Sequence, residues 1–499
     1  MDKSRKTHCW ECRRRYLVCD SAQPGCKRCA NSGVACPGYG SEKPKVLKWL
    51  ATGQVKSRSR RQTKKKATTP IADTHAASRG LTDSLSVMSP SPPALYGDVL
   101  NLGNAVEYFN SCIYQDLIHL NDLGQNPHIY PLSQAHVQSA INLPDYVRFG
   151  MLCMVLNHRL NKEGEDFNRH PLTEKFYRYR GAAIKSLRAQ LSAETQGPSD
   201  LVIAGVLTLL LTDAQHSNTI GWQCHLQGIE KMIALRGGIQ DLARRRGCGP
   251  LFRTLWFISL IRNTTCPASC LYMTASNLEL LDIMLDHHGS KALPFQMCPP
   301  MLLADIIKIS HLREQAAWLG PGDILVSDLS QQAYAILTHL LEFSPEEWAI
   351  TKGHCTEDWT LAGKTYQSSV VLYCISSLHS VSVLPKTPVL SAMRAAHSQS
   401  LRDLLTPALS SLRIRSFMLW PLVILGVEAV HGDMAVRGFV VDELRKMSRQ
   451  AGTYAPLTAV DVLESFWKSG ETSWDACFDR PYVFTTQIAI DTSRISKEI

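Results

Sequence analysis

The spacing of apolar and polar residues changes along the chain, and from about residue 96 it follows long helical periods. Alternating runs of Val, Ile and Thr, which would predict strands, are scarce there. The pattern predicts that residues 96–499 form a large all-α domain. One expected helix face consists of apolar residues three or four positions apart: Phe176, Tyr179, Ala183, Leu187 and Leu191.

A second expected helix carries Ile336, Leu337, Leu340 and Leu341 at the same spacing. The segment Ser344-Pro345-Glu346-Glu347 is typical of a helix start, with an N-cap residue, a proline in the first position and early acidic residues. No heptad pattern is sustained along the chain, so the sequence predicts no coiled coil.

Two long apolar runs are interpreted as buried core. Residues 201–211 are too few for a membrane helix, which needs about 20 apolar residues. Residues 417–430 contain Trp420-Pro421 and Glu428. The N-terminus is polar and basic, without the apolar stretch of a secretory signal. We therefore expect no membrane association, and sixteen cysteines that are thiols or metal ligands.

Composition separates three further segments from the helical part. Residues 1–40 combine cysteines with basic residues, residues 41–66 form a basic extension, and residues 67–95 are rich in Ser, Thr, Ala and Pro. The last composition is typical of a disordered linker. Residues 1–66 carry a net charge of +14, whereas the remaining residues carry −5. This asymmetry indicates a polyanionic partner for the N-terminal part.

The six N-terminal cysteines follow the spacing C-x2-C-x6-C-x6-C-x2-C-x6-C, a repeat in which the first three positions recur seventeen residues later. A two-residue gap lets paired thiolates converge on one soft metal ion, usually zinc. So short a segment buries little surface, so metal binding must supply its folding energy. The predicted ligands are Cys9, Cys12, Cys19, Cys26, Cys29 and Cys36.

The number of thiolates distinguishes two arrangements. A single tetrahedral zinc would use four cysteines and leave two idle. Two zinc ions need eight ligand positions, which six thiolates provide if two of them bridge both ions. The symmetric repeat favours two ions per chain.

Residues 8–40 resemble the fungal Zn(II)2Cys6 binuclear cluster domain. The resemblance implies a small metal-folded domain of two short helices and loops. In that family the first and fourth cysteines bridge, which corresponds to Cys9 and Cys26. Asp20, after the third cysteine, and Pro24 also match the family pattern. The resemblance implies a sequence-specific DNA-binding protein that reads GC-rich half-sites in the major groove with the helix after the second cysteine.

The charges of the two repeats differ in a way that agrees with this docking. The first repeat carries Arg13, Arg14 and Arg15 between its second and third cysteines, where the second repeat has uncharged residues 30–35. We expect the first repeat to face DNA, where arginine bonds guanine with two hydrogen bonds or contacts only phosphate. The remaining expected DNA contacts are Lys6, Tyr16 and Lys27.

Tyr16 departs from the family pattern, because relatives commonly have Lys or Arg there. Val18 departs in the same way, and we expect it to pack against the cluster. We therefore expect a weakened or altered sequence preference. Further along, a basic run is interpreted as a nuclear import signal, as a tail that strengthens phosphate binding, or as a solvated linker. Its cations are Lys56, Arg58, Arg60, Arg61, Lys64, Lys65 and Lys66.

Two segments of the helical part resemble the fungal transcription-factor helical domain. They are residues 222–228, followed by Arg236-Gly237-Gly238, and residues 420–429. Gly237-Gly238 suits a helix C-cap and sharp turn. Trp222 and Trp420 are expected in the core, and His225 as a packed or hydrogen-bonded structural residue. The resemblance implies a regulatory domain for effectors, partners or autoinhibition.

The motifs of phosphate-binding loops, zinc proteases and α/β-hydrolases are absent from the sequence, so no enzyme is predicted. The leading interpretation is a zinc-dependent nuclear regulator of RNA polymerase II transcription, controlling metabolic or biosynthetic genes. Its expected partners are double-stranded DNA and the transcription machinery or co-regulators, with a homodimer left open. The alternative is a nuclear regulator whose DNA reading is degenerate and which acts through protein contacts.

Overall fold

The computed structural model describes residues 9, 12, 19–22, 24–31 and 36, and then residues 92–488 with short gaps. The gaps are 125, 127–128, 165–169, 194–197, 217–220, 246–248, 284–296, 320–324 and 433. The contacts divide the chain into two units, Met1–Val87 and Met88–Ile499, which are treated separately below. In the first unit the described helix is α2, Lys27–Asn31.

The second unit is built of helices, and its described residues include no strand. Its first half runs through α3 (Pro92–Tyr108), the π-helix η1 (Phe109–Ile113), α4 (Tyr114–Leu117), the 3-10 helix η2 (Ile118–Leu123), α5 (Gln134–Ile141), α6 (Asp145–Glu163), α7 (Leu172–Ala193), α8 (Asp200–Ala214), α9 (Trp222–Ala234), α10 (Ile239–Arg244), α11 (Gly249–Thr264), the 3-10 helix η5 (Ala268–Cys270) and α12 (Thr274–Glu279).

The second half of this unit continues the all-helical pattern to residue 477. It comprises α14 (Pro300–Ala317), α15 (Leu325–Glu342), α16 (Pro345–Ile350), α17 (Thr356–Ser380), α18 (Pro388–Ser410), the 3-10 helix η6 (Arg415–Phe417), α19 (Leu419–Glu428), α20 (Met434–Ala451), α21 (Ala455–Ser469) and α22 (Trp474–Cys477). None of the helices searched in the described part of the chain is long and apolar enough to cross a membrane.

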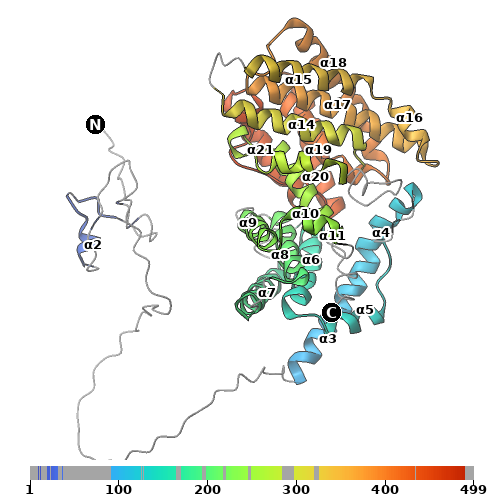
Figure 1. The fold of residues 1–499 in the computed structure, drawn as a ribbon. Coiled ribbons are helices and arrows are strands. Elements are labelled where there is room, and N and C mark those ends of the chain that lie inside the picture. The colour runs from blue at the N-terminus through green and yellow to red at the C-terminus, as the bar shows by residue number, and fades with distance from the viewer. Residues whose placement is uncertain are drawn as a thin grey trace, which may run out of the picture. The chain divides into compact units, whose positions relative to one another are not determined.

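The helices pack in two groups that share contacts (Figure 1). Helices α14, α15, α17 and α18 stack side by side, whereas α6 packs on α7 and α8, and α8 on α9. Helix α20 links the groups, because it contacts α6 as well as α19 and α21. The predicted all-helical fold of this region is therefore confirmed.

The amphipathic patterns are mostly confirmed. In α7 the buried residues include Phe176, Tyr179, Ala183 and Leu187. Leu191 belongs to the same predicted face but lies near the end of α7 and is 42% exposed. In α15, Ile336, Leu337 and Leu340 are buried but Leu341 is 44% exposed. Helix α16 begins as predicted: the Ser344 side chain accepts a hydrogen bond from the Glu347 N–H, and Pro345 occupies the first turn.

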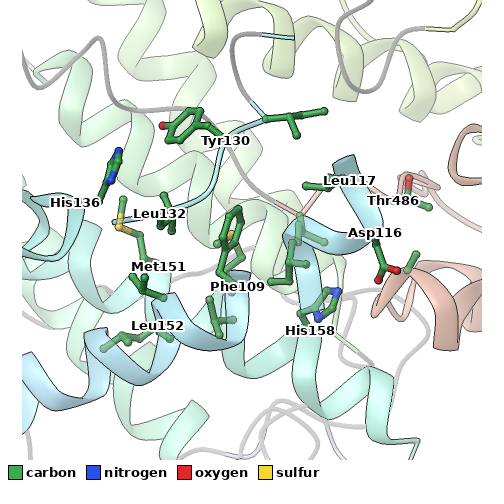
Figure 2. Close-up of a pocket in the computed structure, with 18 of the residues that line it drawn as sticks. Phe109, Asp116, Leu117, Tyr130, Leu132, His136, Met151, Leu152, His158 and Thr486 are labelled. Carbon is green, nitrogen blue, oxygen red and sulfur yellow. The ribbon is translucent and has the colours of Figure 1, made fainter. Parts of the chain in front are cut away.

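A cavity lies within this unit among α3, η1, α4, α5, α6 and α20 (Figure 2). Apolar side chains of α3, η1 and α6 form much of its wall. The segment of residues 481–488, which follows the last helix, contributes as well, because Thr486 lines the cavity. Segments that are far apart in sequence therefore build this feature together.

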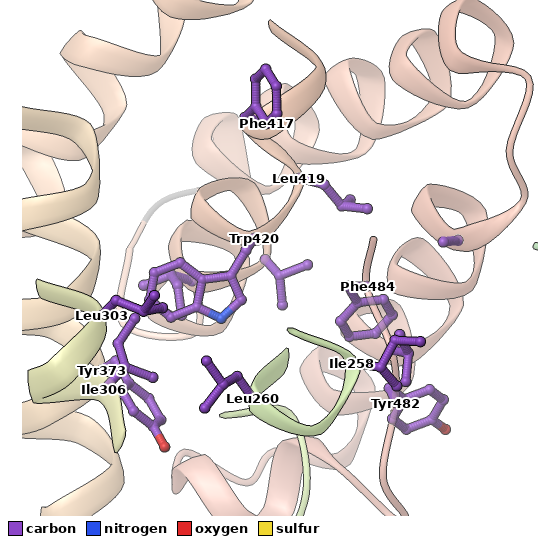
Figure 3. Close-up of a cluster of buried hydrophobic side chains, with 14 of the residues drawn as sticks. Ile258, Leu260, Leu303, Ile306, Tyr373, Phe417, Leu419, Trp420, Tyr482 and Phe484 are labelled. Atoms are coloured by element: carbon purple, nitrogen blue, oxygen red, sulfur yellow. The ribbon is translucent and has the colours of Figure 1, made fainter. Parts of the chain in front are cut away.

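The core of the unit surrounds Trp420 of α19, together with Leu260, Leu303, Tyr373 and Phe484 (Figure 3). The Trp420 side chain is 4% exposed, and its indole N–H donates to Thr264 Oγ1 over 3.0 Å. Most buried indole N–H groups in proteins have such a partner. The predicted burial of residues 201–211 is confirmed throughout. In the run 417–430, residues 417–429 are buried as predicted, whereas Val430 is only partly buried.

Candidate metal centre and nucleic-acid interface

All six N-terminal cysteines meet in the first unit. Their sulfur atoms form two groups of four, and within each group all sulfur atoms lie within 4.8 Å of one another. Cys9 and Cys26 belong to both groups, with their Sγ atoms 3.6 Å apart. The groups are Cys9, Cys12, Cys19 and Cys26, and Cys9, Cys26, Cys29 and Cys36.

The backbone repeats the symmetry of the cysteine spacing. The Cys9 N–H donates to Cys19 Sγ over 3.5 Å, and the Cys26 N–H donates to Cys36 Sγ over 3.4 Å. The Cys12 N–H donates to Cys9 Sγ over 3.4 Å, and the Cys29 N–H donates to Cys26 Sγ over 3.3 Å. Each bond has its counterpart seventeen residues later. Four N–H donors aimed at sulfur atoms would stabilise thiolate charge.

The loop between the repeats holds the second half in place. Helix α2 begins directly after Cys26, and the N–H of its first residue, Lys27, donates to Asp20 Oδ2 over 3.1 Å. Asp20 thus supplies a partner for an N–H that the helix itself leaves unsatisfied. A Cβ on Gly25 would lie 3.2 Å from the Cβ of Cys36, so a side chain there would crowd this cysteine.

The donor set fits a soft divalent metal ion. Burial, followed by hydrogen bonds among the thiols, raises the pKa of Cys12 to about 12, and burial also raises the pKa of Cys9 and Cys29. Without a cation these sulfur atoms would therefore keep their protons. Thiolate sulfur is the ligand that zinc favours in closed structural sites, and zinc would offset the cost of ionisation.

Most residues predicted to contact DNA lie outside the described residues. These are Lys6, Arg13, Arg14, Arg15 and Tyr16, and the same holds for Lys56, Arg58, Arg60, Arg61, Lys64, Lys65 and Lys66.

The described cations of the first unit lie on α2, where Lys27 and Arg28 are both exposed. Arg28 is a further candidate contact that the sequence analysis missed, although it directly follows Lys27 in the sequence. The second repeat therefore also presents positive charge, between its first two cysteines rather than between its second and third.

In the second unit, the segment beginning at Trp222 joins α7, α8 and α9. Arg180 binds Asp213 with two hydrogen bonds, Nε to Oδ1 over 2.7 Å and Nη2 to Oδ2 over 2.6 Å, and His225 Nε2 lies 3.1 Å from Asp213 Oδ2. Burial alone would raise the pKa of Asp213, but the hydrogen bonds from Arg180 and His225 outweigh it and the pKa is lowered. His225 thus has the predicted structural role, and Trp222 is 2% exposed.

The turn after α9 has the predicted form. Gly237 and Gly238 have φ values of +95° and +89°, and the Gly238 N–H donates to the Ile233 carbonyl over 2.9 Å. Glycine adopts this left-handed region without the strain that a side chain brings.

The segment of residues 420–429 forms α19, which packs closely on α21. A Cβ on Gly426 would lie 2.4 Å from Leu463 Cδ1, so the glycine allows this close approach. At the end of the helix, buried Glu428 accepts a hydrogen bond from Ser376 and pairs with Arg394 over 3.3 Å. Burial raises the pKa of Glu428. The segment that begins at Trp222 and the segment of residues 420–429 therefore both hold neighbouring helices together in the core.

Comparisons with known proteins agree with these observations. The model of the fungal Zn(2)-Cys(6) binuclear cluster domain matches residues 7–45, and that of the fungal specific transcription factor domain matches residues 105–483. The chain is 45% identical over 498 residues to a phomenoic acid biosynthesis cluster-specific transcriptional regulator of Leptosphaeria maculans. This similarity covers 99% of the chain and 92% of that relative. No solved structure matches the chain significantly.

Proposed function

Because the chain belongs to the fungal Zn(2)-Cys(6) transcription factors that carry a fungal specific transcription factor domain, we propose that it regulates a biosynthetic gene cluster through a two-zinc DNA-binding module. Membership of this family makes the chain a zinc-binding, DNA-binding transcription regulator rather than an enzyme. The relative that is named as a cluster-specific regulator supports biosynthetic genes as the targets.

The observation that carries the two-ion proposal is the pair of four-sulfur groups that share Cys9 and Cys26. Each group offers one zinc four thiolates, the number that a tetrahedral site takes, and the two shared sulfur atoms would bridge the ions. All six cysteines then serve as ligands. The repeated N–H to sulfur bonds support equal roles for the two halves.

We propose that DNA binds the first repeat, with Arg13, Arg14 and Arg15 as the principal contacts. Lys6 and Tyr16, and Lys27 of the second repeat, are proposed as further contacts. Arginine suits the guanines of a GC-rich half-site in the major groove, because it donates two hydrogen bonds to one base. Lys27 is exposed, as this role requires. The basic run from Lys56 to Lys66 is proposed as the nuclear import signal.

The domain boundaries follow from the same reasoning. We propose a DNA-binding domain over residues 1–40, a basic extension over 41–66, a linker over 67–95 and a regulatory domain over 96–499. Co-regulators would contact the last of these, and a homodimer would have to form without a coiled coil.

The test is a selection of bound duplexes from random DNA, using the zinc-loaded full chain and the Arg15→Ala variant. We expect a GC-rich preferred half-site and a loss of about 1–3 kcal/mol of binding free energy for the variant at that site. An Arg188→Ala variant, at an exposed position of α7, serves as the control.

A wild-type chain that retards DNA without any sequence preference would support the second candidate, a regulator that acts through protein contacts. Tyr16, in a position where family members commonly have a cation, favours that candidate. Equal preference in wild type and Arg15→Ala would contradict the proposed base-reading role of this arginine.

A further inference from the structure

The helical unit contains a cavity of about 920 Å³, and every residue that lines it belongs to Met88–Ile499. This volume is near the upper end of the range of about 300–1,000 Å³ for small-molecule sites. We propose that the cavity binds an aliphatic carboxylic acid, with the acid group at Arg415. This proposal goes beyond DNA binding and does not depend on it.

The wall of the cavity is suited to an aliphatic chain. Phe109 of η1 and Met151 and Leu152 of α6 line it, as Figure 2 shows. Leu102 and Ala105 add apolar surface from α3. Water binds weakly to apolar walls, and an aliphatic ligand that enters the cavity gains free energy because its apolar surface leaves water.

Several polar groups at the cavity are already satisfied. His158 Nδ1 lies 3.2 Å from the Tyr108 hydroxyl, and burial keeps this histidine neutral because it lowers its pKa to about 3. Thr486 Oγ1 donates to the Ser416 carbonyl over 2.9 Å. These groups shape the wall but leave little capacity for a charged ligand.

Arg415 differs from them, because its donors remain available. It lines the cavity with a side chain that is 22% exposed. Its nearest acidic partner is Asp116, with Nη2 and Oδ1 4.0 Å apart, beyond hydrogen-bond distance. Within the described part of the chain, no hydrogen bond from the Arg415 guanidinium is present.

Asp116 is engaged elsewhere, because its other carboxylate oxygen pairs with Lys162. Two cations, Arg415 and Lys162, thus share one carboxylate, which leaves a local charge of +1. A ligand carboxylate would neutralise this charge and accept two parallel hydrogen bonds from the guanidinium.

Another acid, Glu443 of α20, also lines the cavity. Lys446 Nζ lies 3.4 Å from each of its carboxylate oxygens, so the charge of Glu443 is already balanced. The acid group of the ligand is therefore placed at Arg415, and the aliphatic body along the wall formed by α3, η1 and α6.

The test uses the zinc-loaded full chain in equilibrium dialysis against radiolabelled dodecanoic acid and 1-dodecanol. We expect one dodecanoate per chain, bound about tenfold or more tightly than the alcohol, because a hydrogen-bonded charge pair is lost with the alcohol. Arg415→Gln should abolish this preference while the alcohol binds as before. Arg188→Gln, at an exposed position of α7, should leave it unchanged.

A second pair of variants tests the cavity itself. Ala105→Phe and Ala140→Phe place a ring in the cavity from α3 and α5, and either one should block both ligands. Circular dichroism and the melting temperature of the chain report whether each variant folds. The proposal is overturned if wild type binds no dodecanoate saturably, if acid and alcohol bind equally, or if Arg415→Gln retains the preference. Unchanged binding by both folded phenylalanine variants also overturns it.

Discussion

The hydrogen bond between Asp20 and helix α2 leads to a quantitative prediction about zinc affinity. Asp20 Oδ2 accepts a hydrogen bond from the Lys27 N–H, 3.1 Å away, at the start of the helix that carries Cys29. Asp20→Ala removes this partner and leaves the N–H to water. Since metal binding is expected to supply the folding energy of so short a unit, any stability lost by the folded unit should be lost from zinc affinity.

The magnitude follows from the capping contact. Replacing a side chain that caps a helix by alanine costs about 0.5–2 kcal/mol. A loss of about 1 kcal/mol corresponds to about fivefold weaker zinc binding. Asp20→Asn keeps an oxygen acceptor and removes only the charge, which contributes about 0.3–1 kcal/mol at a helix N-terminus. It should therefore weaken zinc binding less than Asp20→Ala does.

The assay is competition of the full chain with a chromophoric zinc chelator at fixed pH and low salt. Asp241→Ala, in the helical unit, is the matched control and should leave zinc affinity unchanged. If Asp20→Ala binds zinc as tightly as wild type, or if Asp20→Asn is the weaker of the two, the capping argument is refuted.

Three further outcomes are expected. Gly426→Ala should lower the melting temperature of the helical unit, because overpacking against Leu463 costs about 1–3 kcal/mol. Gly438→Ala is the control, since its Cβ would meet nothing within 4 Å, and equal melting temperatures of the two variants would contradict the prediction. For His158, the pKa is lowered to about 3, so the unfolded chain takes up its proton as the pH falls below about 6.5. The free energy of unfolding should then fall by up to about 1.4 kcal/mol per pH unit, and less steeply in His158→Gln. Urea unfolding at a series of pH values measures it, and an equal pH dependence in wild type and variant would refute the prediction. Chelation of zinc should abolish DNA retardation while the melting transition of the helical unit persists; its loss would contradict the division into two units.

The sequence predicted the features that depend on local spacing. Cysteine spacing predicted a metal cluster, and helical periodicity predicted the buried faces of α7 and α15. Leu191 and Leu341 follow the same spacing but are exposed, which shows the limit of that signal. Periodicity gives the direction of a residue around its helix, but not how far the neighbouring helices extend along it.

Features built from distant segments were not predictable in this way. Arg313 is buried beside Asp475, with Nη2 and Oδ1 2.9 Å apart, although 162 residues separate them. The cavity combines α3 with α20 and Thr486. Neither is encoded in a local pattern, because each depends on how the helices pack. The availability of Arg415 likewise follows from the pairing of Asp116 with Lys162.

The central claim is that six thiolates hold two zinc ions by sharing Cys9 and Cys26. Zinc X-ray absorption combined with metal analysis of the full chain tests it most directly, with Cys224→Ser, an exposed thiol of α9, as the control. The account predicts two zinc ions per chain, four sulfur ligands for each and zinc–zinc scattering, with both ions disturbed in Cys9→Ser. One zinc per chain, or two without a shared sulfur, would contradict it.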